Sequence, residues 1–435
     1  MLDTTRRRVL AATASLSLPV AGCLTDGSEP QLADPGDAPG DGLPVPEWEP
    51  AEGSPYDAAV EATTVVSGFE IPWSLSFAGP DVFVTERDGG VLRFDRDAVT
   101  DRDGLEPSDA EVVLARDELP DQAAHGEGGT LGVATHPDYP DVPDLFIYYT
   151  ADDGNLENRV VRYDVDDGDL EPILEGVPGA MIHDGGRLAF GPDDALWVTT
   201  GDADDPALAQ DPSSLAGAVL RITPDGDPAP DNPDFGDESD PRTYTLGHRN
   251  PQGLAFTPAD VPIAAEHGPS ARDEVSVLRA GANYGWDVVR GGPDDPQYDA
   301  YGEYEAVTPP ILNTSPDVTW APSGIAFYTA DAIPAWRHRL FVCGLASETL
   351  FAVTLTHDGE EPPLEGDAVR YDADWLDDRF TATAHPFYDG EFGRLRHVEQ
   401  GPDGALYLLT SNRDGRASGE FPRDGDDRLL RLEPT

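Results

Sequence analysis

One pattern recurs six times along this chain: a small or polar start, alternating apolar residues, and a turn rich in Gly, Pro and Asp. Alternation of apolar and polar residues between frequent turn signals indicates antiparallel strands. The copies begin 56 to 71 residues apart. They are PWSLSFAGPD at Pro72, GTLGVATHPD at Gly129, GGRLAFGPDD at Gly185, PQGLAFTPAD at Pro251, PSGIAFYTAD at Pro322 and GRLRHVEQGPDG at Gly393. A chain with this repeat has to build one supersecondary unit six times.

A second apolar segment follows most of these turns, and a third often follows the second. The second segments are DVFVTE, LFIYYT, ALWVTT, RLFVCG and ALYLLT. Units of three to four strands cannot bury their own faces, so they have to stack on one another. No long stretch has a convincing helical period. The sequence therefore predicts an all-β, six-bladed β-propeller over residues 58–435, with a sandwich plus extra domains as the alternative.

The N-terminus has the order of a secretory signal over residues 1–22. Paired Arg residues in TTRRRVL precede an apolar run from Val9 to Val20, which is shorter than the roughly 20 residues of a membrane span. The Arg pair resembles a twin-arginine export signal, and VAGC resembles a lipobox in which Cys23 carries the lipid. We expect an exported protein at the cell surface, lipid-anchored to the outer face of the cytoplasmic membrane. Only Cys343 would then remain, so no intramolecular disulfide is expected.

Residues 24–57 contain seven Pro, five Gly and nine acidic residues, and no basic residue. Such a composition buries too little apolar surface to offset the entropy of ordering. The sequence predicts an extended acidic tether over residues 23–57, between the anchor and the folded domain.

The charge is extreme for a chain of 435 residues. There are 84 acidic and 28 basic residues, all of the basic ones Arg, for a net charge of −56. This charge excludes nucleic acid and anionic lipid headgroups as partners through general electrostatic attraction. Acidic, Lys-free surfaces resemble those of proteins from salt-loving microbes, where a Debye length of about 3 Å at 1 M salt screens the self-repulsion.

Six motifs lie in the loops next to these strands. In chain order they are HGEGGTLGVATHPDY (125–139), HDGGRLAFGPDDALWVTTGD (183–202), LGHRNPQGLAF (246–256), EHGPSARDEV (266–275), GANYGW (281–286) and GRLRH (393–397). Together they resemble the soluble quinoprotein sugar dehydrogenases, the glucose/sorbosone dehydrogenase family, which uses pyrroloquinoline quinone (PQQ) and calcium. The resemblance runs from about Thr63 to the C-terminus.

The residues themselves suggest an acid–base site. His183 opens a Gly-rich turn before one strand, and Asp202 follows the next; neighbouring strands can bring them together as a general base and its orienting carboxylate. Arg249 can supply a fixed positive charge. From the residues alone, a structural His in a turn stays open. The resemblance implies that His183 abstracts a sugar hydroxyl proton while hydride passes to the quinone, and that Arg249 stabilises the reduced quinone oxygens.

PQQ carries three carboxylates, which Arg binds well. Arg394 and Arg396 lie at i and i+2, on the same face of a strand; pairing with nearby acids is the alternative. The resemblance places Glu127, Arg249 and Asn250 beside the cofactor as well.

Calcium prefers oxygen ligands, including backbone carbonyls. The resemblance implies that Gly268 and Pro269 offer carbonyls to the ion, and it associates Glu274 and Tyr284 with the metal. For Glu274, a solvated surface carboxylate remains the alternative.

Two positions depart from the family pattern. Ile182 stands where the glucose enzymes carry an Asp, which puts a preference for glucose in doubt. Ala346 aligns with a Lys of many relatives, so a cation for PQQ is missing.

Taken together, the sequence predicts PQQ- and calcium-dependent oxidation of an aldose to its lactone, with electrons passed to an external acceptor in the membrane. Two alternatives remain: a non-catalytic carbohydrate-binding or interaction propeller, and a calcium-dependent lactone hydrolase on the same fold.

Overall fold

The computed structural model describes residues 32–36, 48–356 and 362–435, all of which belong to one compact unit, Leu32–Thr435. The predicted signal peptide and Cys23 lie outside the described residues. Within these ranges, helix is limited to α1 (Arg96–Asp101) and to short 3-10 turns at Pro55–Asp57, Pro107–Asp109, Arg116–Glu118, Pro206–Gln210, Tyr301–Glu303 and Pro334–Trp336. Among the described residues, no helix is long and apolar enough to cross a membrane.

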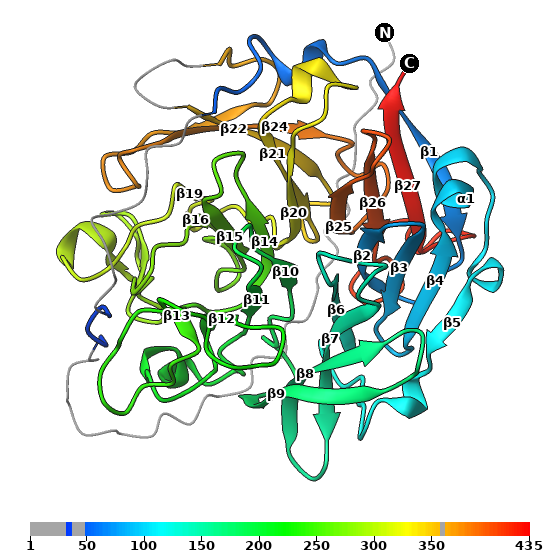
Figure 1. The fold of residues 1–435 in the computed structure, drawn as a ribbon. Coiled ribbons are helices and arrows are strands. Elements are labelled where there is room, and N and C mark those ends of the chain that lie inside the picture. Colours follow the sequence, from blue (N-terminus) through cyan, green and yellow to red (C-terminus); the bar gives the residue numbers. More distant parts are fainter. Residues whose placement is uncertain (1–31, 37–47, 357–361) are drawn as a thin grey trace, which may run out of the picture. The chain divides into compact units, whose positions relative to one another are not determined.

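Six antiparallel sheets surround a common centre (Figure 1), which confirms the predicted six-bladed β-propeller. Blade one contains β2 (Pro72–Ala78), β3 (Asp81–Glu86), β4 (Val91–Asp95) and β5 (Glu111–Leu114). Blade two contains β6 (Thr130–Thr135), β7 (Asp144–Asp152), β8 (Leu156–Asp164) and β9 (Leu170–Pro178). Blade three contains β10 (Leu188–Phe190), β11 (Leu196–Thr199), β12 (Ala218–Ile222) and β13 (Thr243–Leu246).

The remaining blades follow the same order from the centre outward. Blade four contains β14 (Pro251–Phe256), β15 (Pro262–Glu266), β16 (Glu274–Val277) and β19 (Leu312–Asn313). Blade five contains β20 (Pro322–Tyr328), β21 (Arg339–Gly344), β22 (Leu350–Thr356), β24 (Thr381–Phe387) and β23 (Val369–Tyr371). Blade six contains β25 (Leu395–Gln400), β26 (Leu406–Thr410), β27 (Arg428–Pro434) and β1 (Val60–Ser67). A separate parallel pair joins β17 (Val289–Gly291) to β18 (Asp299–Ala300).

The two ends of the propeller meet in blade six. Strand β1 pairs with β27 in antiparallel register, from Val60 opposite Pro434 to Ser67 opposite Arg428. The first strand of the domain therefore completes the last blade and closes the ring. The repeat predicted where each blade starts, but it did not predict this closure, because β1 precedes the first repeated opening.

The hydrophobic core lies between the blades. Each of the six largest clusters of buried apolar residues joins neighbouring blades. Phe83 and Ile147, for example, share the cluster between blades one and two. A blade thus buries both of its faces, and seven consecutive residues of β7, Leu145–Ala151, are buried. This two-sided burial explains the near-continuous apolar runs of the second strands.

Parts of the predicted tether lie against the propeller. The ring of Trp48 packs against Phe327 and Phe380, with centroids 5.9 and 6.4 Å apart. Arg339 donates from Nη2 to the carbonyls of Ala51 and Gly53 at 2.7 and 2.9 Å. The structure differs here from an extended spacer over all of residues 23–57. The composition of the whole segment does not predict this packing, because it depends on one large aromatic side chain, Trp48, within a polar stretch.

Candidate active site

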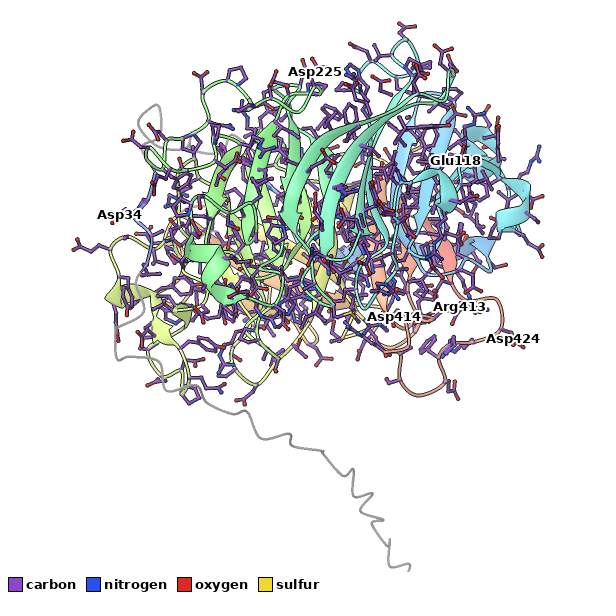
Figure 2. The ribbon with its side chains drawn as sticks, turned by 90° about the horizontal axis from the view of Figure 1, so that it is seen from below. Asp34, Glu118, Asp225, Arg413, Asp414 and Asp424 are labelled. Atoms are coloured by element: carbon purple, nitrogen blue, oxygen red, sulfur yellow. The ribbon has the colours of Figure 1, made fainter. Side chains whose placement is uncertain are left out.

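The predicted catalytic and cofactor residues converge at one end of the propeller. Glu127, His183, Asn250 and Arg394 each lie just before the first strand of a blade, and these strands all begin at the same end. Figure 2 shows Asp414, which bonds to Arg394, on the loop between β26 and β27 at this end, with Asp225 at the opposite end. The repeat thus brings together loops that are distant in sequence.

His183 and Asp202 form a buried pair. Nδ1 of His183 lies 2.7 Å from Oδ1 of Asp202. The amide of Asp204 donates to the same oxygen at 2.9 Å, and Nε1 of Trp286 donates to Oδ2 at 2.7 Å. Asp202 is fully buried and His183 is 7% exposed. An ionised carboxylate can only accept, so Nδ1 carries a proton; in the neutral imidazole, Nε2 then keeps a lone pair.

The local backbone brings the pair together. His183 has a φ of +64°, in the left-handed region. Gly201 passes so close that a Cβ there would lie 1.8 Å from the carbonyl oxygen of His183. Only glycine fits at such an approach, and Asp202 follows it directly.

Glu127 connects the site loops through both carboxylate oxygens. Oε2 accepts from the amide of His183 at 3.1 Å and from Nδ2 of Asn250 at 3.3 Å. Oε1 accepts from Nη1 of Arg416 at 2.5 Å. Burial acts to raise the pKa of Glu127, but the charges of His267 and Arg416 outweigh it and hold this pKa at about 2.

Arg249 lies between the base and the predicted calcium loop. Its Nη1 donates to the carbonyl of Gly268 at 3.0 Å, and its guanidinium carbon lies 5.4 Å from the ring centroid of Trp286. Nε of Arg249 is buried without a hydrogen-bond partner. Burial lowers the pKa of Arg249, and the charge of Asp202 opposes that shift.

The two predicted carboxylate-binding arginines differ in their partners. Arg394 donates from Nε and Nη2 to Oδ2 of Asp414 at 3.0 and 2.8 Å, so pairing with an acid is observed for this residue. Arg396 donates from Nη1 to Oε1 of Gln252 at 2.7 Å and keeps a buried Nε without a partner. Burial lowers the pKa of Arg396 to about 10.

Comparison with known proteins identifies the family. The model of the family described as Glucose / Sorbosone dehydrogenase matches residues 69–419. The chain belongs to the glucose/sorbosone dehydrogenase family. It is 30% identical to the aldose sugar dehydrogenase YliI of Escherichia coli, over 84% of this chain and 94% of that one. It is 32% identical to quinoprotein glucose dehydrogenase B of Acinetobacter calcoaceticus, over 68% and 66%.

Solved structures of sugar dehydrogenases have the same fold. The PQQ-bound form of aldose sugar dehydrogenase from Streptomyces coelicolor is 33% identical, with a TM-score of 0.65, and the match covers 86% of this chain and 98% of that one. The predictions of the family and of an oxidoreductase, a sugar dehydrogenase, are therefore confirmed.

Two residues that the family resemblance associated with calcium are engaged elsewhere. Glu274 lies 2.8 Å from Nη1 of Arg290, and it accepts from Tyr301 and Asn313 at 2.7 and 2.8 Å. It is 1% exposed, so it is not a solvated surface carboxylate.

The hydroxyl of Tyr284 donates to the carbonyl of Val277 at 2.5 Å, and its ring stacks on His248 with centroids 4.7 Å apart. Each of these two side chains therefore has hydrogen-bond partners within the protein, and their association with calcium stays a prediction. The described residues contain no cluster of three or more His, Cys, Asp or Glu side chains that could hold a metal.

The predicted calcium loop folds tightly around Gly268. A Cβ at Gly268 would lie 1.9 Å from the carbonyl oxygen of Ala271 and 2.3 Å from that of Arg272. The amide of Gly268 donates to Oδ1 of Asp273 at 2.8 Å and fixes the turn. Gly268 is therefore tightly enclosed by its own loop, and its carbonyl accepts from Nη1 of Arg249. The association of this loop with calcium stays a prediction.

Sequence reasoning missed at least five residues of the site, among them Arg87, which directly follows β3. Trp286 and His267 lie inside the motifs NYGW and EHGP and could have been found there. Asp414 and Arg416 lie in RDGRASG, where neither periodicity nor a motif marks them. Their one signal is position, since they follow the second strand of a blade just as Asp202 does.

Proposed function

We propose that this sugar dehydrogenase oxidises an aldose to its lactone, with PQQ held among its arginines and calcium at the Gly268 loop. The observation that supports PQQ most strongly is a cluster of cations in a chain of net charge −56. Five Arg residues interact with the site carboxylates Glu127, Asp202 and Asp414: Arg87, Arg249, Arg394, Arg396 and Arg416.

The arginine cluster fits a polyanionic ligand. Arg87, Arg249 and Arg396 each keep a buried Nε without a hydrogen-bond partner. A buried, unpartnered donor is costly in free energy, at about 1–3 kcal/mol. A ligand with three carboxylates would supply acceptors for such groups. Arg290 and Arg339, outside this cluster, also keep a buried Nε without a partner, so it is the number of arginines gathered here that supports PQQ.

The chemistry divides between the cofactor and the chain. When bound, PQQ supplies a quinone that accepts the hydride from the sugar carbon. His183 takes the hydroxyl proton at Nε2, because Nδ1 is committed to Asp202 at 2.7 Å. Loss of one proton and one hydride converts the anomeric C–OH group into the lactone carbonyl. Arg249, fixed on the carbonyl of Gly268, offers positive charge where negative charge develops.

For calcium, we propose the carbonyls of Gly268 and Pro269; the Gly268 carbonyl is the one that accepts from Nη1 of Arg249 at 3.0 Å, so Arg249 would have to turn away from this oxygen when the ion binds. Hard cations accept such oxygen ligands. Glu274 and Tyr284 then act outside the ligand set: Glu274 pairs with Arg290 and Tyr284 packs on His248.

We further propose that electrons pass to an acceptor in the membrane. The twin-arginine signal and the lipobox at Cys23 support export and a lipid anchor on the outer face of the cytoplasmic membrane. A tethered enzyme remains close to a membrane acceptor. The acidic, Lys-free composition supports a high-salt environment.

Family membership favours oxidation over the two alternatives. A non-catalytic propeller has no need of a buried His–Asp pair next to a cluster of arginines. A calcium-dependent lactone hydrolase has no need of cations for three cofactor carboxylates.

A dye-linked assay tests the proposal. The purified chain is reconstituted with PQQ and calcium in molar KCl, and aldoses are screened for dye reduction, with lactones as parallel substrates. We expect aldose-dependent reduction that requires both additions. Lactone hydrolysis without dye reduction would favour the hydrolase instead.

A further inference from the structure

We propose that Trp286 is the positioning residue of this site. Its indole N–H orients Asp202, and thereby sets the tautomer of His183, while its ring supports Arg249. The inference rests on the proposed function, in which His183 is the base and Arg249 the cation.

The first observation is the hydrogen bond to Asp202. Nε1 of Trp286 donates to Oδ2 at 2.7 Å, while Oδ1 is shared by His183 and the amide of Asp204. Trp286 is 5% exposed and Asp202 is fully buried, so water does not readily replace this donor. A carboxylate held at both oxygens cannot rotate, and its Oδ1 stays directed at Nδ1 of His183.

The second observation is the position of the indole ring. The guanidinium carbons of Arg249 and Arg290 lie 5.4 and 5.9 Å from its centroid, within the usual range of a cation–π contact. Arg249 has only backbone carbonyls as hydrogen-bond acceptors for Nη1, and none for Nε. The ring therefore adds a contact that these hydrogen bonds do not supply, and one side chain contacts both Asp202 and Arg249.

Trp197 provides a matched control. It is 4% exposed and lies 5.9 Å from the guanidinium carbon of Arg221, much as Trp286 lies by Arg249. Its Nε1, however, is buried without a hydrogen-bond partner. Trp286→Phe and Trp197→Phe remove the same atoms from similar surroundings, but only Trp286→Phe removes a donor from Asp202.

The test is the tautomer of His183, read from its imidazole 15N shifts in the cofactor-free full-length protein at about pH 9, where an ordinary imidazole is neutral. We expect the Nδ1–H form in the wild type and in Trp197→Phe, and a Nε2–H fraction about tenfold larger in Trp286→Phe, from loss of a charge-assisted hydrogen bond. In the reconstituted enzyme, kcat of Trp286→Phe should fall about tenfold at nearly constant KM. A tautomer ratio in Trp286→Phe equal to that in Trp197→Phe overturns the proposal.

A second readout needs no substitution, in case Trp286→Phe does not fold. In wild-type protein labelled with 15N-tryptophan, the indole proton of Trp286 should resonate at lower field than that of Trp197, because only Trp286 donates to a carboxylate. Equal positions contradict the proposal.

The experiments distinguish a failure of the proposed function from a failure of the positioning role of Trp286. If PQQ does not bind but Trp286→Phe still shifts the tautomer, the proposed function is wrong and the positioning role stands. If Trp286→Phe turns over aldose with the wild-type tautomer, only the positioning role is wrong.

Discussion

His183 is the side chain on which the proposed chemistry depends most. His183→Ala removes the base but none of the arginines, so we expect turnover to fall about 10²–10⁴-fold with PQQ affinity nearly unchanged. The dye-linked assay and a PQQ titration measure the two effects. His136→Ala, at the far end of β6, is the control and should leave both unchanged. Activity of His183→Ala within a few-fold of the wild type would show that another group is the base.

A substitution at Ala346 tests whether the absence of a Lys at this position weakens PQQ binding. It is exposed on the loop between β21 and β22, next to Leu345, whose carbonyl accepts from Nη1 of Arg394 at 3.0 Å. We expect Ala346→Lys to tighten PQQ binding about ten- to hundredfold, the worth of one charge-assisted hydrogen bond. Turnover at saturation should change little, because a carboxylate contact acts equally in the ground and transition states.

The control for this substitution is Ala332→Lys, at the opposite end of the β20–β21 hairpin. It adds the same charge to the same blade away from the site. Quinone absorbance follows both titrations. Equal affinities for the two variants would mean that Ala346 does not face the cofactor or that another cation already fills the role.

Glu127 makes a prediction about acid stability. Its pKa is held at about 2, below the ordinary value of 4.5. A carboxyl with a depressed folded-state pKa stabilises the fold above its unfolded pKa and loses that contribution as the pH falls. The loss should occupy the window from about pH 4.5 to about pH 2 and amount to no more than about 3 kcal/mol.

Urea unfolding in molar KCl at a series of pH values measures this contribution. Glu127→Gln should be less stable than the wild type at neutral pH, with a flatter pH dependence below pH 4.5. Glu52→Gln, which removes an exposed carboxylate, should follow the wild-type curve. A curve for Glu127→Gln as steep as the wild-type curve would assign the acid sensitivity to other groups.

Some of this site could be predicted from the sequence and some could not. His183, Asp202 and Arg249 lie in motifs at strand starts and ends, where a repeating fold has to bring loops together. The ligand role of Glu274 could not be judged in advance, because it depends on Arg290 reaching the same buried space. Asp414 was missed because its partner Arg394 lies 20 residues away, just before β25.

At the scale of elements, the segment before β1 makes a prediction of its own. Trp48 and the carbonyls that Arg339 binds hold residues 48–57 on blade five. Trp48→Ala should lower the free energy of unfolding by about 1–3 kcal/mol, because the ring is only half-buried. It should also expose residues 51–57 to proteases, which mass spectrometry of the cleaved ends detects. Unchanged cleavage sites would mean that Arg339 alone holds the segment.

The strands themselves were the most predictable elements. The openings at Pro72, Pro251 and Pro322 are the first residues of β2, β14 and β20. The alternating pattern locates these strands because successive side chains point to opposite faces of the sheet, and each face packs against a different neighbouring blade. The role of β1 depends on a partner at the other end of the chain, β27, and no local pattern carries that information.

At the scale of the whole molecule, the net charge of −56 predicts a strong dependence on salt. Like charges repel across the folded surface, and molar salt shortens the Debye length to about 3 Å. We expect Tm to rise from low salt into the molar range of KCl, with a much smaller effect of an uncharged osmolyte. A Tm that does not change with KCl concentration would contradict the explanation of the acidic composition as an adaptation to high salt.

The most direct test of the central claim is the spectrum of the reconstituted protein under anaerobic conditions. PQQ and calcium are added to the full chain in molar KCl, and an aldose that reduces the dye is then added without any electron acceptor. The proposed function predicts conversion of the quinone spectrum to that of the reduced cofactor, with one lactone formed per bound PQQ. A protein that binds no PQQ, or whose bound quinone stays oxidised in the presence of every aldose tested, would contradict it.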